Sequence, residues 1–148
     1  MIRRIGPADR AAYLALASEF YRTGAVLSPV PAENFVRTFE ELMRSDEYAS
    51  GYLLTDGGRP AGYALLSRTF SQEAGGMVVW LEELYVRPEY RGRGHARAFF
   101  RYLEAHEPAV RYRLELEPEN ERAAALYRRM GYRPMPYAQM VREIKTGT

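Results

Sequence analysis

A turn rich in glycine and arginine, Arg91–Ala96, lies between a strand-like run and an amphipathic, helix-like run. A helix N-terminus offers unpaired backbone N–H groups and the positive end of the helix dipole, so it binds anions, phosphates above all. Gly92 and Gly94 would let the backbone approach a phosphate closely. The turn predicts a phosphate site or, on spacing alone, an ordinary solvated turn; it matches neither a P-loop nor the dinucleotide fingerprint.

Two adjacent carboxylates, Glu82 and Glu83, interrupt the apolar run "VVWLEELYV". Consecutive strand residues point to opposite faces, so we expect these two side chains on opposite faces of a sheet. Because helices should cover both faces, at least one carboxylate is expected to be enclosed, which is costly without a partner. The pair indicates either a salt bridge to an arginine or a functional role, as a general base or as an anchor for a cationic substrate.

Asn120 and Tyr127 lie seven residues apart in a helix-like run, so they share one helix face about two turns apart. From the residues alone, Tyr127 is best explained as an aromatic side chain of a buried stripe. Asn120 fits a helix N-cap. His95 and His106 have no partner visible in the sequence and are weaker candidates for chemistry.

The elements that would position these residues follow from hydrophobic periodicity and turn signals. A short strand is followed by two amphipathic helices, joined through the proline-containing loop "LSPVPAEN"; three strands, a helix, a strand, a helix and one or two short final strands come next. The final strands are expected within "YRPMPYAQMVREI", and the strand before the last helix within residues 110–117. This order predicts one mixed α/β domain over residues 1–148.

Composition excludes several classes of protein. The chain has 148 residues, a formal net charge of +2 and no cysteine, so disulfides, thiolate metal sites and a cysteine nucleophile are ruled out. The charge is too small to indicate nucleic acid or a membrane surface as the main partner. No run approaches the roughly 20 apolar residues of a membrane span, and the N-terminus lacks a signal-peptide core. We expect a cytoplasmic protein that uses no metal.

Two sequence blocks resemble the GNAT (GCN5-related N-acetyltransferase) family. "RGRGHA" fits that family's Arg/Gln-x-x-Gly-x-Gly/Ala turn, with Ala96 in place of the commoner second glycine. "LELEPENERAAALYRRMGYRP" is similar to a second family block, in which a strand is followed by Asn120, by Tyr127 and then by Gly131-Tyr132. The resemblance implies a single-domain α/β fold with a mixed, mostly antiparallel sheet, helices on both faces and a splayed central pair of strands.

The resemblance also implies acetyl-CoA as co-substrate. In the family, the turn holds the pyrophosphate through backbone N–H groups. By this match the pyrophosphate residues are Arg91, Gly92, Arg93, Gly94, His95 and Ala96. The pantetheine arm is expected to pair with the backbone of Leu84, Tyr85 and Val86, where this strand diverges from its neighbour, and to contact Asn120 and Tyr127.

Acetyl transfer to an amine requires that the ammonium lose a proton, because an alkylammonium has no lone pair. The departing thiolate benefits from a proton donor. The resemblance makes Tyr127 that acid. "WLEELYV" is similar to the "LEDxxV" segment of the diamine and polyamine branch, which implies Glu82 as the base and Glu83 as the acid that helps to hold the amine. A base that acts through water remains an alternative.

The sequence therefore predicts an N-acetyltransferase that acts on a small-molecule primary amine by direct attack in a ternary complex. Since the first two helices shape the acceptor site in this family, Phe20, Tyr21, Glu33 and Phe35 are candidate pocket residues. A peptide or protein acceptor and a non-catalytic acyl-CoA sensor are the alternatives, and an RNA-binding role is disfavoured by the near-neutral charge. Homodimer formation is expected only by analogy with the fold.

Overall fold

The computed structural model describes residues 1–24 and 29–145. The chain forms two compact units, Met1–Glu117 and Pro118–Thr148. The expectation of a single domain over residues 1–148 stays a prediction. Residues 27 and 28 of the expected loop "LSPVPAEN" lie outside the described residues.

The first unit contains a five-stranded sheet in the order β1-β2-β3-β4-β5. Its strands are β1 (Ile2–Arg4), β2 (Ala49–Asp56), β3 (Arg59–Ser71), β4 (Gly76–Val86) and β5 (Arg111–Leu114). The first four pair antiparallel with their neighbours, and β5 runs parallel to β4. Only the last connection needs a crossover, which a helix supplies.

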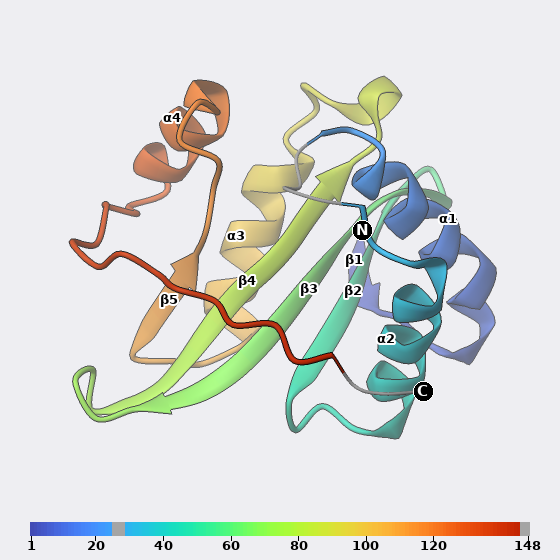
Figure 1. Cartoon of the computed structure of the whole chain (residues 1–148). Helices are drawn as coiled ribbons and strands as arrows, with labels where there is room; N and C mark the ends of the chain where they lie inside the picture. The colour runs from blue at the N-terminus through green and yellow to red at the C-terminus, as the bar shows by residue number, and fades with distance from the viewer. Residues whose placement is uncertain (25–28, 146–148) are drawn as a thin grey trace. The chain divides into compact units, whose positions relative to one another are not determined.

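Helices cover both faces of this sheet (Figure 1). The helices are α1 (Arg10–Tyr21), α2 (Ala32–Arg44) and α3 (His95–His106). On one face, Tyr13 and Leu16 of α1 and Phe39 of α2 pack with Leu53 and Tyr63 of the sheet. On the other face, buried Phe99 of α3 contacts the Tyr52 ring. The predicted mixed α/β class, with helices on both faces, is confirmed.

The neighbouring strands β4 and β5 diverge, and β5 is the last strand of the described sheet rather than a central one. Their register runs only from Val78 opposite Arg111 to Leu81 opposite Leu114. Beyond Leu81, β4 continues to Val86 while β5 has ended, and the two strands point away from each other in Figure 1. The predicted splay is therefore present, and the strand expected over residues 110–117 is shorter than its alternating pattern because its partner has turned away.

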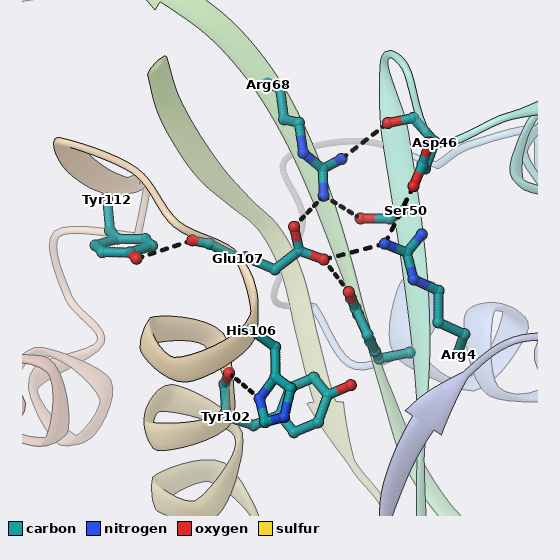
Figure 2. A network of polar contacts seen from close by, with 9 residues as sticks. Arg4, Asp46, Ser50, Arg68, Tyr102, His106, Glu107 and Tyr112 are labelled. Atoms are coloured by element: carbon teal, nitrogen blue, oxygen red, sulfur yellow. Dashed lines mark hydrogen bonds and ion pairs between the residues drawn. The ribbon is translucent and has the colours of Figure 1, made fainter. Parts of the chain in front are cut away.

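A buried polar network ties the end of α3 to three strands (Figure 2). The Glu107 carboxylate accepts hydrogen bonds from Arg68 of β3, Tyr52 of β2 and Arg4 of β1. Arg68 also donates to the Ser50 hydroxyl oxygen at 3.0 Å. Because the cation partners satisfy Glu107, an ionised group is tolerated at 6% exposure.

The second unit contains α4 (Glu121–Arg129). Asn120 accepts a hydrogen bond from the Ala123 backbone N–H at 3.1 Å, so its predicted capping role is confirmed. Gly131, with φ 91, follows the helix in a left-handed conformation that favours glycine. The strands expected in "YRPMPYAQMVREI" are wrong: residues 133–145 form none, and Tyr137 and Met140 are exposed. A strand needs a hydrogen-bonded neighbour, and alternation along the chain does not supply one.

Candidate active site

The glycine turn leads directly into α3, so its two glycines lie next to the first backbone N–H groups of that helix. A short 3-10 helix, Pro88–Tyr90, leads into the turn, and Gly94 directly precedes the first residue of α3. Gly92 and Gly94 have φ values of 77° and 83°, which side chains with a Cβ rarely adopt. Apart from the glycine and its two chain neighbours, no heavy atom of residues 1–24 and 29–145 lies within 4 Å of a Cβ built on either residue. Glycine is therefore required by the backbone conformation, and it leaves open space beside the first N–H groups of the helix.

The arginines of this turn have partners within the protein. The Arg91 Nε donates to the Val86 carbonyl oxygen at 2.8 Å, and its guanidinium lies over the Tyr85 ring. Arg93 lies 3.3 Å from an Asp56 carboxylate oxygen, and the His95 Nε2 lies 2.9 Å from the same oxygen. The hydrogen bonds from His95 and from Arg93 lower the pKa of Asp56. Sequence reasoning missed Asp56, whose only signal is its place in a hairpin turn.

The β4 backbone that was expected to pair with pantetheine is paired on one side only within the first unit. Val86, Tyr85 and Leu84 lie opposite Gly62, Tyr63 and Ala64 of β3 in the strand register. On the other side β5 ends at Leu114. A Cβ on Gly62 would lie 2.1 Å from the Tyr85 carbonyl oxygen, so glycine allows the two strands to approach here. The need for glycine at position 62 could not be predicted from the spacing of residues in the sequence.

A β-bulge changes where the two carboxylates point. Leu65 of β3 lies opposite Glu83, but the next residue, Leu66, lies opposite Leu81, so Glu82 is an extra residue in β4. The Ser67 hydroxyl donates to Glu82 at 2.5 Å. Since Leu65 and Ser67 are two residues apart on one strand, they share a face, and Glu82 and Glu83 both lie on it. The expectation of opposite faces is wrong, because the bulge interrupts the alternation.

This shared face is the one that α1 and α2 cover, since Leu65 packs in their core. The Glu83 carboxylate accepts a hydrogen bond from Tyr21 at the end of α1 and another from Tyr63 of β3, the latter at 2.6 Å. Burial raises the pKa of Glu83, and the nearby Glu82 charge acts in the same direction. Burial and the hydrogen bond to Glu83 raise the pKa of Tyr21, so its phenol keeps its proton at neutral pH.

The two carboxylates thus differ in their surroundings. Glu82 is exposed and accepts its hydrogen bond from Ser67, whereas Glu83 is partly enclosed with both oxygens engaged. The salt-bridge alternative is not realised in residues 1–24 and 29–145, where neither carboxylate forms an ion pair. Tyr21 was a candidate pocket residue, and Tyr63 was missed because a tyrosine in an apolar strand gives no signal of its partner.

An ion pair ties α1 to the end of β4. Arg87 donates to both Glu19 carboxylate oxygens, at 2.9 and 2.8 Å, and to the Pro60 carbonyl oxygen at 2.9 Å. The hydrogen bonds from Arg87 lower the pKa of Glu19. This contact holds the end of α1, which carries Tyr21, against the strand that carries Glu83.

Tyr127 belongs to α4 in the second unit. Its ring lies 6.3 Å from that of Tyr132, centroid to centroid, and burial raises its pKa. A phenol with a raised pKa stays protonated at neutral pH, which a proton donor requires. Its role as the acid stays a prediction.

No group of three or more His, Asp or Glu side chains that could hold a metal ion occurs in residues 1–24 and 29–145. Over the same residues, no helix combines the length and the apolarity needed to cross a membrane.

Several solved structures share this fold. A possible acetyltransferase from Clostridium difficile 630 is 19% identical, with a TM-score of 0.84 over 99% of this chain and 98% of its own. The aminoglycoside acetyltransferase AAC(6')-Iy in complex with a bisubstrate analogue, CoA-S-monomethyl-acetylneamine, is 17% identical, with a TM-score of 0.80 over 97% of each chain. An integron cassette protein from the mobile metagenome of Cole Harbour Salt Marsh is 21% identical, with a TM-score of 0.78 over 99% and 91%.

No curated protein matches the sequence. The model of the acetyltransferase (GNAT) family matches residues 11–132, a span that contains the glycine turn, the bulged strand and the α4 helix. This chain belongs to the GNAT family and is an N-acetyltransferase.

Proposed function

We propose that the protein transfers the acetyl group of acetyl-CoA to a primary amine of a small molecule, by direct attack in a ternary complex. The observation that carries this proposal is the bulge in β4. It brings Glu82 and Glu83 onto one face beside the diverging strands, with no cation of the described residues paired to either. Two neighbouring carboxylates that have hydrogen-bond donors but no cation beside them suit an ammonium group supplied by the substrate.

The residues of the first unit fit a CoA donor. Gly92 and Gly94 leave open space beside the first N–H groups of α3, which suits a pyrophosphate. Within the first unit β4 pairs at Leu84–Val86 only with β3, which suits an amide-containing arm on its other side, where the Val86 carbonyl oxygen already accepts a hydrogen bond from Arg91. Acetyl-CoA supplies the activated acetyl group. Arg91, Arg93 and His95, with the small Ala96, complete the proposed phosphate site.

In the proposed reaction Glu82 takes the proton of the acceptor ammonium. It is the exposed carboxylate of the pair, so an incoming amine can reach it. Glu83 holds a negative charge beside it and attracts the cation. Tyr127 keeps a proton on its phenol oxygen and donates it at the end of the reaction, and Asn120 caps the helix that carries it. A diamine or polyamine acceptor agrees with the two carboxylates, and the resemblance of "WLEELYV" to that branch agrees with it too.

A panel of amines tests the acceptor class. The protein is incubated with acetyl-CoA and with monoamines, diamines, polyamines, amino acids, aminoglycosides or a peptide, while free thiol is followed. The aminoglycosides belong in the panel because a protein of the same fold, AAC(6')-Iy, is an aminoglycoside N-acetyltransferase. Rapid thiol release with small amines is expected. Release with the peptide alone would make peptides the acceptor, and CoA binding without any release would indicate a sensor.

Paired pH–rate profiles test the two glutamates with the best amine. Glu82→Gln keeps the shape but cannot accept a proton, so turnover should recover at alkaline pH, where the amine is deprotonated in solution. Glu83→Gln should mainly raise KM, since it loses attraction for the cation. Recovery in Glu83→Gln alone would reverse the two roles. Recovery in neither would assign deprotonation to water.

A further inference from the structure

Glu83 is a partly enclosed carboxylate that no cation of the described chain neutralises. Other enclosed acids of the first unit have an arginine: Asp9 pairs with Arg3 at 2.7 Å, and Glu107 pairs with Arg68. Glu83 instead accepts hydrogen bonds from two phenols. Neutral donors satisfy the carboxylate oxygens and favour the ionised form of Glu83 without cancelling its charge, so they oppose the burial that raises its pKa.

The two phenols are held in different ways. Tyr63 is fully buried, and its ring packs against those of Tyr13, Phe20 and Tyr85. Tyr63 is therefore fixed by the core whether or not it binds Glu83. The position of the Tyr63 ring therefore does not depend on whether an acceptor is bound.

Tyr21 is the last residue of α1, and its ring lies 5.2 Å from those of both Phe20 and Phe35, centroid to centroid. Phe35 lies in the first turns of α2. The Tyr21 side chain therefore joins the end of one helix, the start of the next and the bulged strand. Its hydroxyl is the contact that links the two helices to the carboxylate pair.

We propose that Tyr21 is a positioning residue for the acceptor site: its hydroxyl, together with that of Tyr63, fixes the Glu83 carboxylate in its ionised form as the charge that attracts a cationic acceptor. The proposal rests on the proposed function and adds a residue to it. Tyr21 acts through Glu83, so its removal should affect the attraction of the cation before it affects proton transfer.

The groups around Glu83 determine which way its pKa should move when the Tyr21 hydroxyl is removed. The titratable groups that face it are Tyr13 and Tyr21 from α1, Tyr63 from β3 and Glu82 from β4. Burial and the Glu82 charge raise the pKa of Glu83, and the two phenol hydrogen bonds lower it. Removing one phenol hydroxyl takes away one of the two hydrogen bonds that lower the pKa of Glu83, while the burial that raises it remains. Protonation of Glu83 should therefore begin at a higher pH.

The test is Tyr21→Phe, which removes the hydroxyl and keeps the ring. With a diamine acceptor, KM should rise several-fold while kcat changes by less than about twofold, and the acidic limb of kcat/KM should move up by roughly one pH unit. Tyr112→Phe is the matched control. Its hydroxyl also makes one partly buried hydrogen bond, to the Glu107 carbonyl oxygen at 2.8 Å, and its loss should leave the pH profile unchanged.

A second readout is independent of turnover. Carbon-13 NMR of glutamate carboxylates, with Glu83→Gln to assign the signal, gives the titration midpoint of Glu83 in the whole protein. The midpoint should be higher in Tyr21→Phe than in the unaltered protein and in Tyr112→Phe. Equal midpoints in all three proteins would overturn the proposal, as would a change in kcat alone.

The two proposals fail separately. If the unaltered protein acetylates no amine, the proposed function fails, while a raised midpoint in Tyr21→Phe would still show that the phenol holds Glu83 ionised. If acetylation proceeds and Tyr21→Phe changes neither KM nor the midpoint, the positioning role alone is refuted.

Discussion

Glu107→Gln tests whether the network at the end of α3 stabilises the fold without taking part in the chemistry. Glu107 is 6% exposed and accepts hydrogen bonds from Arg68, Tyr52 and Arg4 (Figure 2). Glutamine keeps the shape, but its NH₂ must replace one acceptor oxygen. The Arg68 guanidinium, whose side chain is 16% exposed, then loses its anionic partner.

The magnitude follows from what Arg68 retains. Removing one partner of a buried ion pair costs about 3–5 kcal/mol, because the other charge stays buried without compensation. Arg68 keeps hydrogen bonds to the Ser50 hydroxyl at 3.0 Å and to the Asp46 carbonyl oxygen at 3.1 Å, which favours the lower end of that range. We expect a loss of about 3 kcal/mol in the free energy of unfolding, or roughly 6–12 °C in Tm for a chain of this size.

Urea denaturation at neutral pH measures this loss, with Glu104→Gln as the control. Glu104 is an exposed residue of the same helix, so its change should cost less than about 0.5 kcal/mol. The glycine turn lies at the other end of α3, about 18 Å away along the 12-residue helix. Well below Tm, kcat/KM should therefore be unchanged. A loss below about 1 kcal/mol, or a large fall in kcat/KM in the folded variant, would refute the reasoning.

Three further predictions concern the site's framework. Gly62→Ala should cost about 3 kcal/mol or more in urea denaturation, because its Cβ would lie 2.1 Å from the Tyr85 carbonyl oxygen; a loss below 1 kcal/mol would contradict the close strand approach. Glu19 has a lowered pKa through Arg87, so its stabilisation is present above the unfolded pKa and lost as pH falls through the folded one. Glu19→Gln should therefore be about 1–2 kcal/mol less stable at pH 7, with the difference shrinking below about pH 4 in denaturation curves; a constant difference would contradict this linkage. Gly94→Glu should abolish CoA binding in calorimetry. Gly75→Glu, which adds the same charge at a similar φ of 78°, should not, although both variants carry a backbone strain of about 1 kcal/mol. Equal CoA binding by both variants would show that the phosphate site is not at this turn.

Local patterns determined most of the elements. Periodicity predicted the two helices that pack on one face of the sheet and the helix that follows the glycine turn, because burial of a stripe such as Tyr13 and Leu16 needs only neighbouring residues on the chain. The left-handed conformation of Gly92 and Gly94 was implied by residue type, since few other residues adopt it. The cap at Asn120 was predictable for the same reason: its hydrogen-bond partner is three residues away.

The direction of the two site carboxylates was decided by the tertiary structure. Glu82 and Glu83 share a face because Leu65 lies opposite Glu83 while Leu66 lies opposite Leu81, which leaves Glu82 as an extra residue in β4. Such a bulge depends on how the partner strand pairs, and the sequence of β4 alone does not show it. The strands expected in residues 133–145 failed for a related reason, since alternation cannot provide a neighbouring strand. Tyr21 reaches Glu83 from 62 positions away in the chain. Contacts of this kind depend on how helices pack on the sheet, and so the sequence alone could identify the carboxylates but not the groups that hold them.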